Sequence, residues 1–184
     1  MNAQLCIAFA GSRLVAAGPL TEVALRAKKA VDKGETVLVF DDATSEPIEL
    51  DLRGTAKDVL ERLQQPEAAR APGRPKLGVV AREVTLLPRH WEWLGAQPGG
   101  ASVALRKLVE EARRANGDAD RARAARDAAY RFMSVMAGNL AGFEEASRAL
   151  FANDRRRFVG LIAGWPDDIR DHVVKLAFSD RAEP

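Results

Sequence analysis

Adjacent carboxylates occur twice in the chain and are the first residues to consider for metal binding or acid–base chemistry. The pairs are Asp41-Asp42 and Asp167-Asp168, and carboxylates of this kind serve both purposes in enzymes. Asp41-Asp42 opens the polar run Asp-Asp-Ala-Thr-Ser, which is typical of a turn. Asp167-Asp168 follows Pro166, an order typical of the first turn of a helix. We therefore interpret both pairs as structural.

Cysteine and histidine are too few to form a metal centre. Cys6 is the single cysteine, and its apolar neighbours predict a buried strand thiol. His90 and His172 are distant in the sequence, so there is no zinc-type cluster. His172 falls between the apolar positions of its helix, and we expect it in solvent. The sequence also lacks a Gly-rich phosphate loop and a nucleophile elbow, so we expect no cofactor and no enzymatic activity.

Positive charge is concentrated in one part of the chain. The whole sequence has 28 basic and 26 acidic residues. Residues 1–69 carry 8 basic and 11 acidic side chains, residues 70–114 carry 9 and 4, and residues 115–184 carry 11 and 11. The excess of five positive charges in the middle segment is typical of a surface that binds a polyanion.

The composition excludes several classes of protein. With 47% hydrophobic and 29% charged residues, the chain should fold as a globular protein. It has no apolar run long enough to span a membrane. Its first residues lack the charged lead and the long apolar core of a secretory signal. We expect no membrane partner and a cytoplasmic location.

Residues 1–66 are expected to form an α/β unit with the order β-β-α-β-β-α. Two apolar runs flank a Gly11-Ser12 turn, which predicts a hairpin. A helix should follow at 20–33, and two strands at 36–42 and 46–54. Thr55 and Asp58 have the spacing of a capping box at the start of a last helix.

The rest of the chain divides into a linker and two further units. Residues 67–81 are basic and rich in Pro and Gly, which predicts an extended linker. Residues 82–117 should form a strand and two helices. Residues 118–184 show four apolar helical stripes and should form a helical bundle. The overall fold class is α+β.

The strand–helix–helix segment has a distinct order of signals. "REVTLLP" alternates and ends at a proline, as a short edge strand does. "RHWEWLGAQ" predicts a first helix, and Pro98-Gly99-Gly100 ends it. Ser102 could cap a second helix that closes at Asn116-Gly117. The apolar stripe of this second helix consists of Leu105, Leu108, Val109 and Ala112.

The Leu-Pro before the first helix, the glycine turn, Ser102 and the aliphatic stripe resemble a ribbon-helix-helix module. In that family two chains pair their strands, and the resulting ribbon enters the major groove of DNA. The resemblance implies a homodimer and a double-stranded DNA partner. A strand and two short helices also bury too little apolar surface to be stable alone.

The resemblance also implies roles for individual residues. Basic side chains in and before the segment would contact phosphate, Thr85 would point at base edges, and Ser102 would lie near a backbone phosphate. The "PGRPKLG" stretch at 72–78 also resembles the core of an AT-hook, which lays an arginine in the minor groove. The basic candidates are Arg74, Lys76, Arg82 and Arg89.

A second interpretation needs no DNA. If Val84 and Leu86 face inward, then Glu83 and Leu87 face outward, and neither is typical of a side chain that reads bases. The segment would then only dimerise the chain, and the protein would be an interaction or assembly module with a protein partner.

The chain also resembles, nearly end to end, an uncharacterised bacterial family that bears a domain-of-unknown-function label. The stretches that carry this resemblance are "FDDATSEPIELDLRG", "GRPKLGVVAREVTLLPRHWEWLGAQPGGAS" and "FVGLIAGWPDDIRDHV". The resemblance implies no activity, and it implies that the three units occur together.

Overall fold

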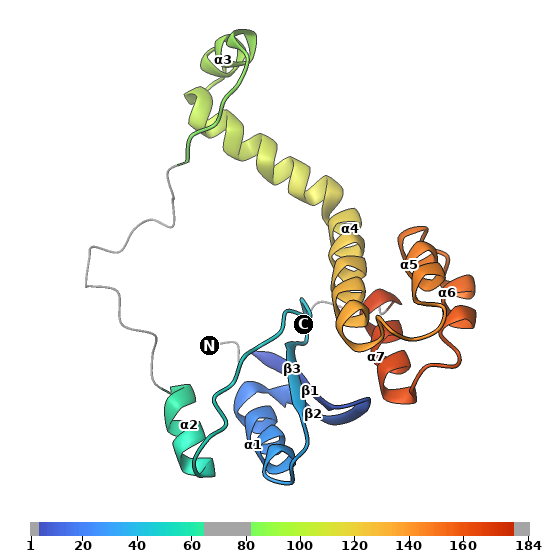
Figure 1. Cartoon of the computed structure of the whole chain (residues 1–184). Helices are drawn as coiled ribbons and strands as arrows, with labels where there is room; N and C mark the ends of the chain where they lie inside the picture. Colours follow the sequence, from blue (N-terminus) through green and yellow to red (C-terminus); the bar gives the residue numbers. More distant parts are fainter. Residues whose placement is uncertain (1–3, 65–81, 179–184) are drawn as a thin grey trace. The chain divides into compact units, whose positions relative to one another are not determined.

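The computed structural model describes residues 4–64 and 82–178 of the chain. It divides into two compact units (Figure 1). Unit 1 combines Met1–Pro66 with Arg121–Pro184, and unit 2 is Glu67–Asp120. The predicted linker at 67–81 lies outside the described residues. The fold class α+β is confirmed, since a small sheet occurs together with helices.

The sheet of unit 1 has three antiparallel strands in the order β2-β1-β3. The strands are β1 (Leu5–Ala10), β2 (Arg13–Pro19) and β3 (Val37–Asp41). The predicted hairpin of β1 and β2 is confirmed, with Gly11 at φ +56° in the turn between them. Helix α1 (Leu20–Val31) follows β2 directly.

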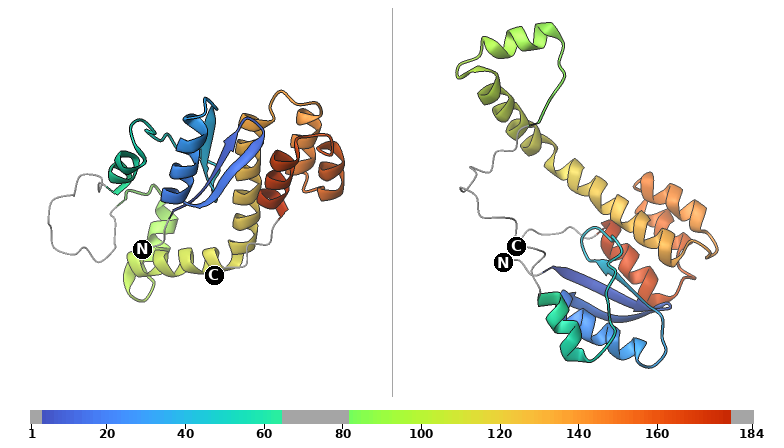
Figure 2. Two further views of the ribbon diagram at one scale, coloured as in Figure 1. Left: turned by 90° about the horizontal axis from the view of Figure 1, so that it is seen from below. Right: turned by 60° about the vertical axis from the view of Figure 1, so that its left-hand side comes forward.

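The two faces of β1 belong to two different parts of the core. Cys6 and Ala8 point to one face and pack with residues of α1 such as Val23. Ile7 and Phe9 point to the other face and pack with the helices of residues 121–178. The sheet therefore lies between α1 on one side and the later helices on the other (Figure 2).

Phe132 is the centre of the larger core. Its buried ring lies 5.2 Å from the ring of Phe9, 5.3 Å from that of Phe40 and 4.6 Å from that of His172. The expectation that His172 is in solvent is wrong, because only 6% of the residue is exposed. Its imidazole packs against the rings of Phe9 and Phe132. Residues from both ends of the chain therefore share one core.

The fourth predicted strand does not form. Phe40 and Pro47 make one isolated bridge, and the amide of Ile48 donates to the carbonyl of Val39 at 2.8 Å. Residues 48–54 then leave β3 without further strand pairing. Proline has no amide to donate, so this position is a poor start for a ladder. Alternate side chains of the segment still pack on the core, as the alternation predicts: Ile48, Leu50 and Leu52.

Helix α2 (Ala56–Gln64) begins with the predicted capping box. The amide of Thr55 donates to the Asp58 carboxylate at 2.7 Å, and the amide of Asp58 donates to the Thr55 hydroxyl at 3.3 Å. These hydrogen bonds hold the pKa of Asp58 below its usual value.

Five helices follow in the remainder of the described chain. They are α3 (Pro88–Gly95), α4 (Gly100–Met136), α5 (Phe143–Phe151), α6 (Arg155–Leu161) and α7 (Asp167–Phe178). The last three are where the apolar stripes predict them. The expected helix end at Asn116-Gly117 is wrong, because α4 runs through it as one helix. The side-chain amide of Asn116 donates to the carbonyl of Ala112, one turn earlier in that helix, at 2.9 Å, and one glycine costs a helix only about 1 kcal/mol.

Candidate functional site

Unit 2 contains the segment with the predicted DNA contacts. Helix α3 (Pro88–Gly95) begins with proline at its first position, directly after Leu87 in an extended conformation. Residues 82–87 form no strand within the described part of the chain. The expected strand is thus not made by a single copy, and pairing with a second copy stays a prediction.

A tight turn joins α3 to α4. Gly99 and Gly100 both have left-handed backbone angles, at φ +86° and +76°. A Cβ on Gly99 would lie 3.1 Å from the side chain of Val103, so space and backbone both favour glycine there. Helix α4 begins at Gly100, two residues earlier than the predicted cap. Ser102 therefore lies in the first turn rather than at the N-cap, and its carbonyl accepts from Arg106.

Most large apolar side chains in the described part of unit 2 are exposed. Leu94 and Ala104 are the buried apolar residues among those described in this unit. The exposed set comes from the extended segment, from α3 and from the stripe of α4, and each member is between 43% and 56% exposed. It consists of Val84, Leu87, Trp91, Trp93, Leu108 and Val109. We call these six residues the apolar set of unit 2. Two exposed tryptophans within so small a unit are unusual for a surface that faces only water.

The predicted polar contacts lie beside the apolar set. Arg82, Thr85, Arg89 and Ser102 are all exposed. Neither Arg82 nor Arg89 forms an ion pair with a carboxylate within residues 82–120 or the described part of unit 1. Arg74 and Lys76, together with the stretch that resembles an AT-hook, lie outside the described residues. The exposed Glu83 lies next to Arg82 in the chain and lowers the local positive charge.

Asp41-Asp42 has the structural role that the sequence predicts. The Asp41 carboxylate accepts hydrogen bonds from the amides of Ala43 and Thr44, each at 2.9 Å. Partial burial alone would raise the pKa of Asp41, but these hydrogen bonds lower it below the usual value. Asp42 lies 3.5 Å from the ammonium group of Lys175. This pair closes a turn and links it to α7.

Asp167-Asp168 lies in the first turn of α7, again as predicted. Asp167 pairs with Arg170 at 2.8 Å within the helix. The carboxylate of Asp168 accepts the outward amide of Leu14 on the edge strand β2 at 2.7 Å. That contact occupies a donor that another strand could otherwise use. No group of three or more metal-binding side chains occurs within residues 4–64 and 82–178.

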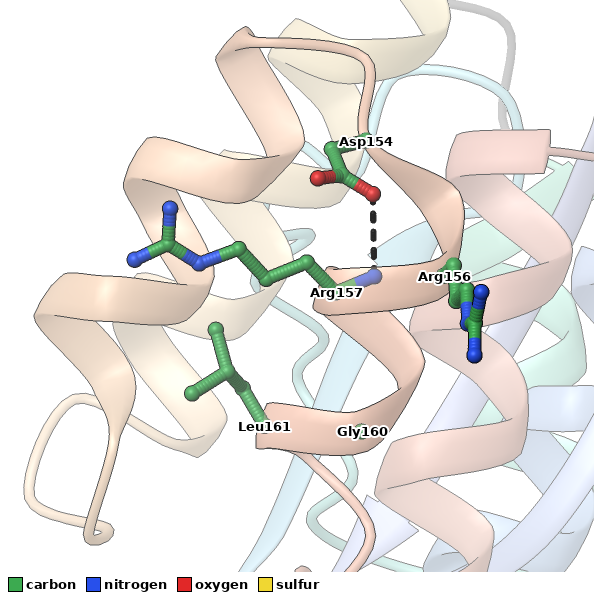
Figure 3. A pocket seen from close by; sticks show the side chains of 5 residues that line it. All are labelled: Asp154, Arg156, Arg157, Gly160 and Leu161. Carbon is green, nitrogen blue, oxygen red and sulfur yellow. Dashed lines mark hydrogen bonds between the residues drawn. The ribbon is translucent and has the colours of Figure 1, made fainter.

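The described surface of unit 1 includes hollows beside α1 and along α6. One, of about 690 Å³, lies between α1 and the start of α2, and Lys28, Lys29 and Asp32 contribute to its lining. The Lys28 ammonium is already paired with Asp32 at 2.8 Å. The other, of about 420 Å³, lies along α6 and is lined by Asp154, Arg156, Arg157, Gly160 and Leu161 (Figure 3). Sequence reasoning missed the arginines of this second hollow, although the run of three arginines at 155–157 was a visible signal.

Comparison with known proteins gives a family and no activity. The model of the family described as "Uncharacterized protein conserved in bacteria (DUF2239)" matches residues 5–177. No curated protein and no solved structure matches the chain. Within the described residues, no helix is both long enough and apolar enough to cross a membrane.

Proposed function

The chain belongs to this bacterial family of uncharacterized proteins, and from the surface of unit 2 we propose that it is a homodimer that binds double-stranded DNA. The observation that carries the proposal is the exposure of the apolar set of unit 2, in a segment whose two arginines, Arg82 and Arg89, form no ion pair with a described residue. One surface would bind a second copy, and the other would contact phosphate.

The apolar set supports self-association. Burial of apolar surface contributes about 25 cal/mol per Å², and each member of the apolar set is still 43% to 56% exposed in one copy. In the proposed dimer, residues 82–87 of two copies pair as antiparallel strands. This pairing gives partners to backbone groups that lack them in one copy. Leu108 and Val109 then pack against their counterparts on the second α4.

The arginines support a nucleic-acid partner. Arg82 and Arg89 flank the extended segment at its two ends, and Thr85 lies between them. Arginine contacts phosphate through several donors in one plane. A two-stranded ribbon is narrow enough for the major groove, where a threonine can contact base edges. Ser102, in the first turn of α4, would lie near a backbone phosphate.

A second candidate function is assembly without DNA. Glu83 and Leu87 favour it, because both are exposed on the segment that would face the groove. A carboxylate repels phosphate, and a leucine offers no hydrogen bond to a base. In this case the dimer would present unit 1 twice to a protein partner.

Fluorescence anisotropy of a labelled duplex at several salt concentrations distinguishes the two functions. DNA binding predicts salt-sensitive association. Arg82→Ala with Arg89→Ala removes two phosphate contacts from each chain of the dimer and should reduce the magnitude of the slope of log K against log salt by about 4. The control Arg26→Ala with Lys33→Ala removes the same charge from exposed positions of unit 1 and should leave that slope unchanged. A wild-type protein that binds no duplex at low salt would contradict DNA binding and leave assembly as the function.

A further inference from the structure

Helix α6 begins with three consecutive arginines, Arg155, Arg156 and Arg157. The neighbouring carboxylate, Asp154, accepts the backbone amide of Arg157 at 3.0 Å and so caps the helix. Neither Arg156 nor Arg157 forms a side-chain ion pair or hydrogen bond with another described residue.

One of the three arginines has a structural role. The guanidinium carbon of Arg155 lies 5.7 Å from the centre of the Phe178 ring, in a cation–π contact that joins α6 to α7. Arg156 and Arg157 are exposed instead and line the hollow along α6. The two side chains leave the helix on different sides (Figure 3).

The lining of the hollow leaves room beside these arginines. A Cβ added to Gly160 would have no atom within 4 Å, so the surface next to the arginines is open. Leu161 supplies an apolar wall. The charged residues that line the hollow are Asp154, Arg156 and Arg157. The carboxylate already accepts a hydrogen bond, and neither guanidinium group has a partner among the described residues.

This arrangement fits an extended anion better than a small one. Two guanidinium groups that diverge cannot converge on a single phosphate ion. They can contact successive phosphates along a nucleic-acid strand, for which arginine is well suited. We propose that Arg156 and Arg157 form a second contact surface of this protein, on unit 1, for the phosphate backbone of double-stranded DNA. The choice of partner rests on the proposed function, whereas the location rests on α6 itself.

The proposal predicts different effects on stability and on binding. Arg156 and Arg157 are exposed and form no ion pair with a described residue, so replacing both with glutamine should leave the melting temperature nearly unchanged. The same change removes two phosphate contacts from each chain of the dimer. The affinity for a duplex at about 0.1 M salt should fall by about tenfold or more, and the magnitude of the salt slope by about 4. Substitution of a residue with only a structural role would lower both the melting temperature and the affinity for the duplex.

The test uses the full chain and the labelled duplex of the preceding section. Arg156→Gln with Arg157→Gln is compared with Arg26→Gln plus Lys33→Gln, which removes equal charge from exposed positions around α1. Loss of affinity in the first variant and not in the second supports the proposal. Equal loss in both overturns it, because bulk charge alone would then explain the effect. Arg156→Lys with Arg157→Lys keeps the charge and should retain affinity within about fivefold. Should the glutamine variant fail to fold, loss of binding in the folded lysine variant would overturn the proposal, and retention would support it.

The outcomes also separate this inference from the proposed contacts of unit 2. If only the variant of Arg82 and Arg89 loses affinity, the proposed function stands and the surface on α6 is overturned. If only the variant of Arg156 and Arg157 loses affinity, α6 is supported and the assignment to Arg82 and Arg89 is overturned. A wild-type chain that binds no duplex at low salt overturns both.

Discussion

The position of Cys6 in the fold determines the pKa and the reactivity of its thiol. Its side chain is fully buried on the central strand, between the sheet and α1. Burial, followed by the negative charges of Asp41 and Asp42, raises the pKa of the thiol from 9.0 to about 11. The folded state therefore favours the protonated thiol over the thiolate. The stability that this shift contributes is present below pH 9 and is lost as the pH rises toward 11.

We predict that Cys6 does not react with iodoacetamide at pH 8 in the folded protein. The nucleophile is the thiolate, which is both scarce at that pH and inaccessible. Mass spectrometry after one hour should show the unmodified chain, and the same treatment in urea should add one carbamidomethyl group. Rapid modification of the folded protein, at the rate of the unfolded one, would show that β1 is not buried as described.

Single residues were predictable where local sequence decides their role. The buried thiol, the turn at Asp41-Asp42 and the helix start at Asp167-Asp168 all follow from adjacent residues. His172 was not predictable, because its burial depends on Phe9 and Phe132, which are distant in the sequence. An imidazole between apolar positions of a helix is usually in water, and only the long-range contact reverses that expectation.

The turn between α3 and α4 is the element-scale feature on which the proposed interface depends. It sets the direction of both helices, and with them the apolar set of unit 2. Its first glycine, Gly99, has a positive φ, and a Cβ there would lie only 3.1 Å from the side chain of Val103. Gly95, at the end of α3, has a helical backbone and open space around it.

We predict that Gly99→Ala destabilises the α3–α4 pair by about 1–2 kcal/mol, the cost of a left-handed alanine. Gly95→Ala is the matched control and should be neutral or stabilising, because alanine favours helix. Amide hydrogen exchange of α3 measures both effects. Equal protection of α3 in the two variants would show that the turn does not constrain the helices.

At the scale of elements, helices were more predictable than strands. Stripes with a 3.6-residue period located α5, α6 and α7, because each helix forms its own hydrogen bonds. The alternation of Ile48, Leu50 and Leu52 was correct for packing but not for a strand, since a strand also needs an edge to pair with. The segment at 82–87 has the same requirement, and its proposed edge lies on another copy of the chain. When a strand needs a second copy of the chain as its partner, the hydrophobic periodicity of a single chain does not predict the pairing.

Unit 1 is assembled from both ends of the chain. Ile7, Phe9 and Phe40 from the first 66 residues share a core with Phe132 and Val173 from the last 64. The sequence offers a composition shift at residues 67–81 that suggests separate units on either side, but composition does not report which apolar faces meet. Long-range packing of this kind is the part of the fold that local signals leave open.

We predict that residues 1–66 do not fold when expressed alone. Without α4 and α7, one whole face of the sheet would expose buried aromatic rings to water. The proton–nitrogen correlation spectrum of the fragment should have the narrow dispersion of an unfolded chain. A control fragment pair, 1–66 mixed with 82–184, should recover dispersed signals. A folded spectrum of 1–66 alone would contradict the shared core.

The mass of the protein in solution tests the proposed dimer most directly. Light scattering during size-exclusion chromatography at micromolar concentration should give twice the chain mass of 20.0 kDa. Leu108→Glu with Val109→Glu places charges in the proposed interface and should give a folded 20.0 kDa monomer. Val135→Glu, an equally exposed position of α4 in unit 1, should remain a dimer. A wild-type mass of 20.0 kDa, or a dimer that survives the double substitution, would contradict self-association through unit 2.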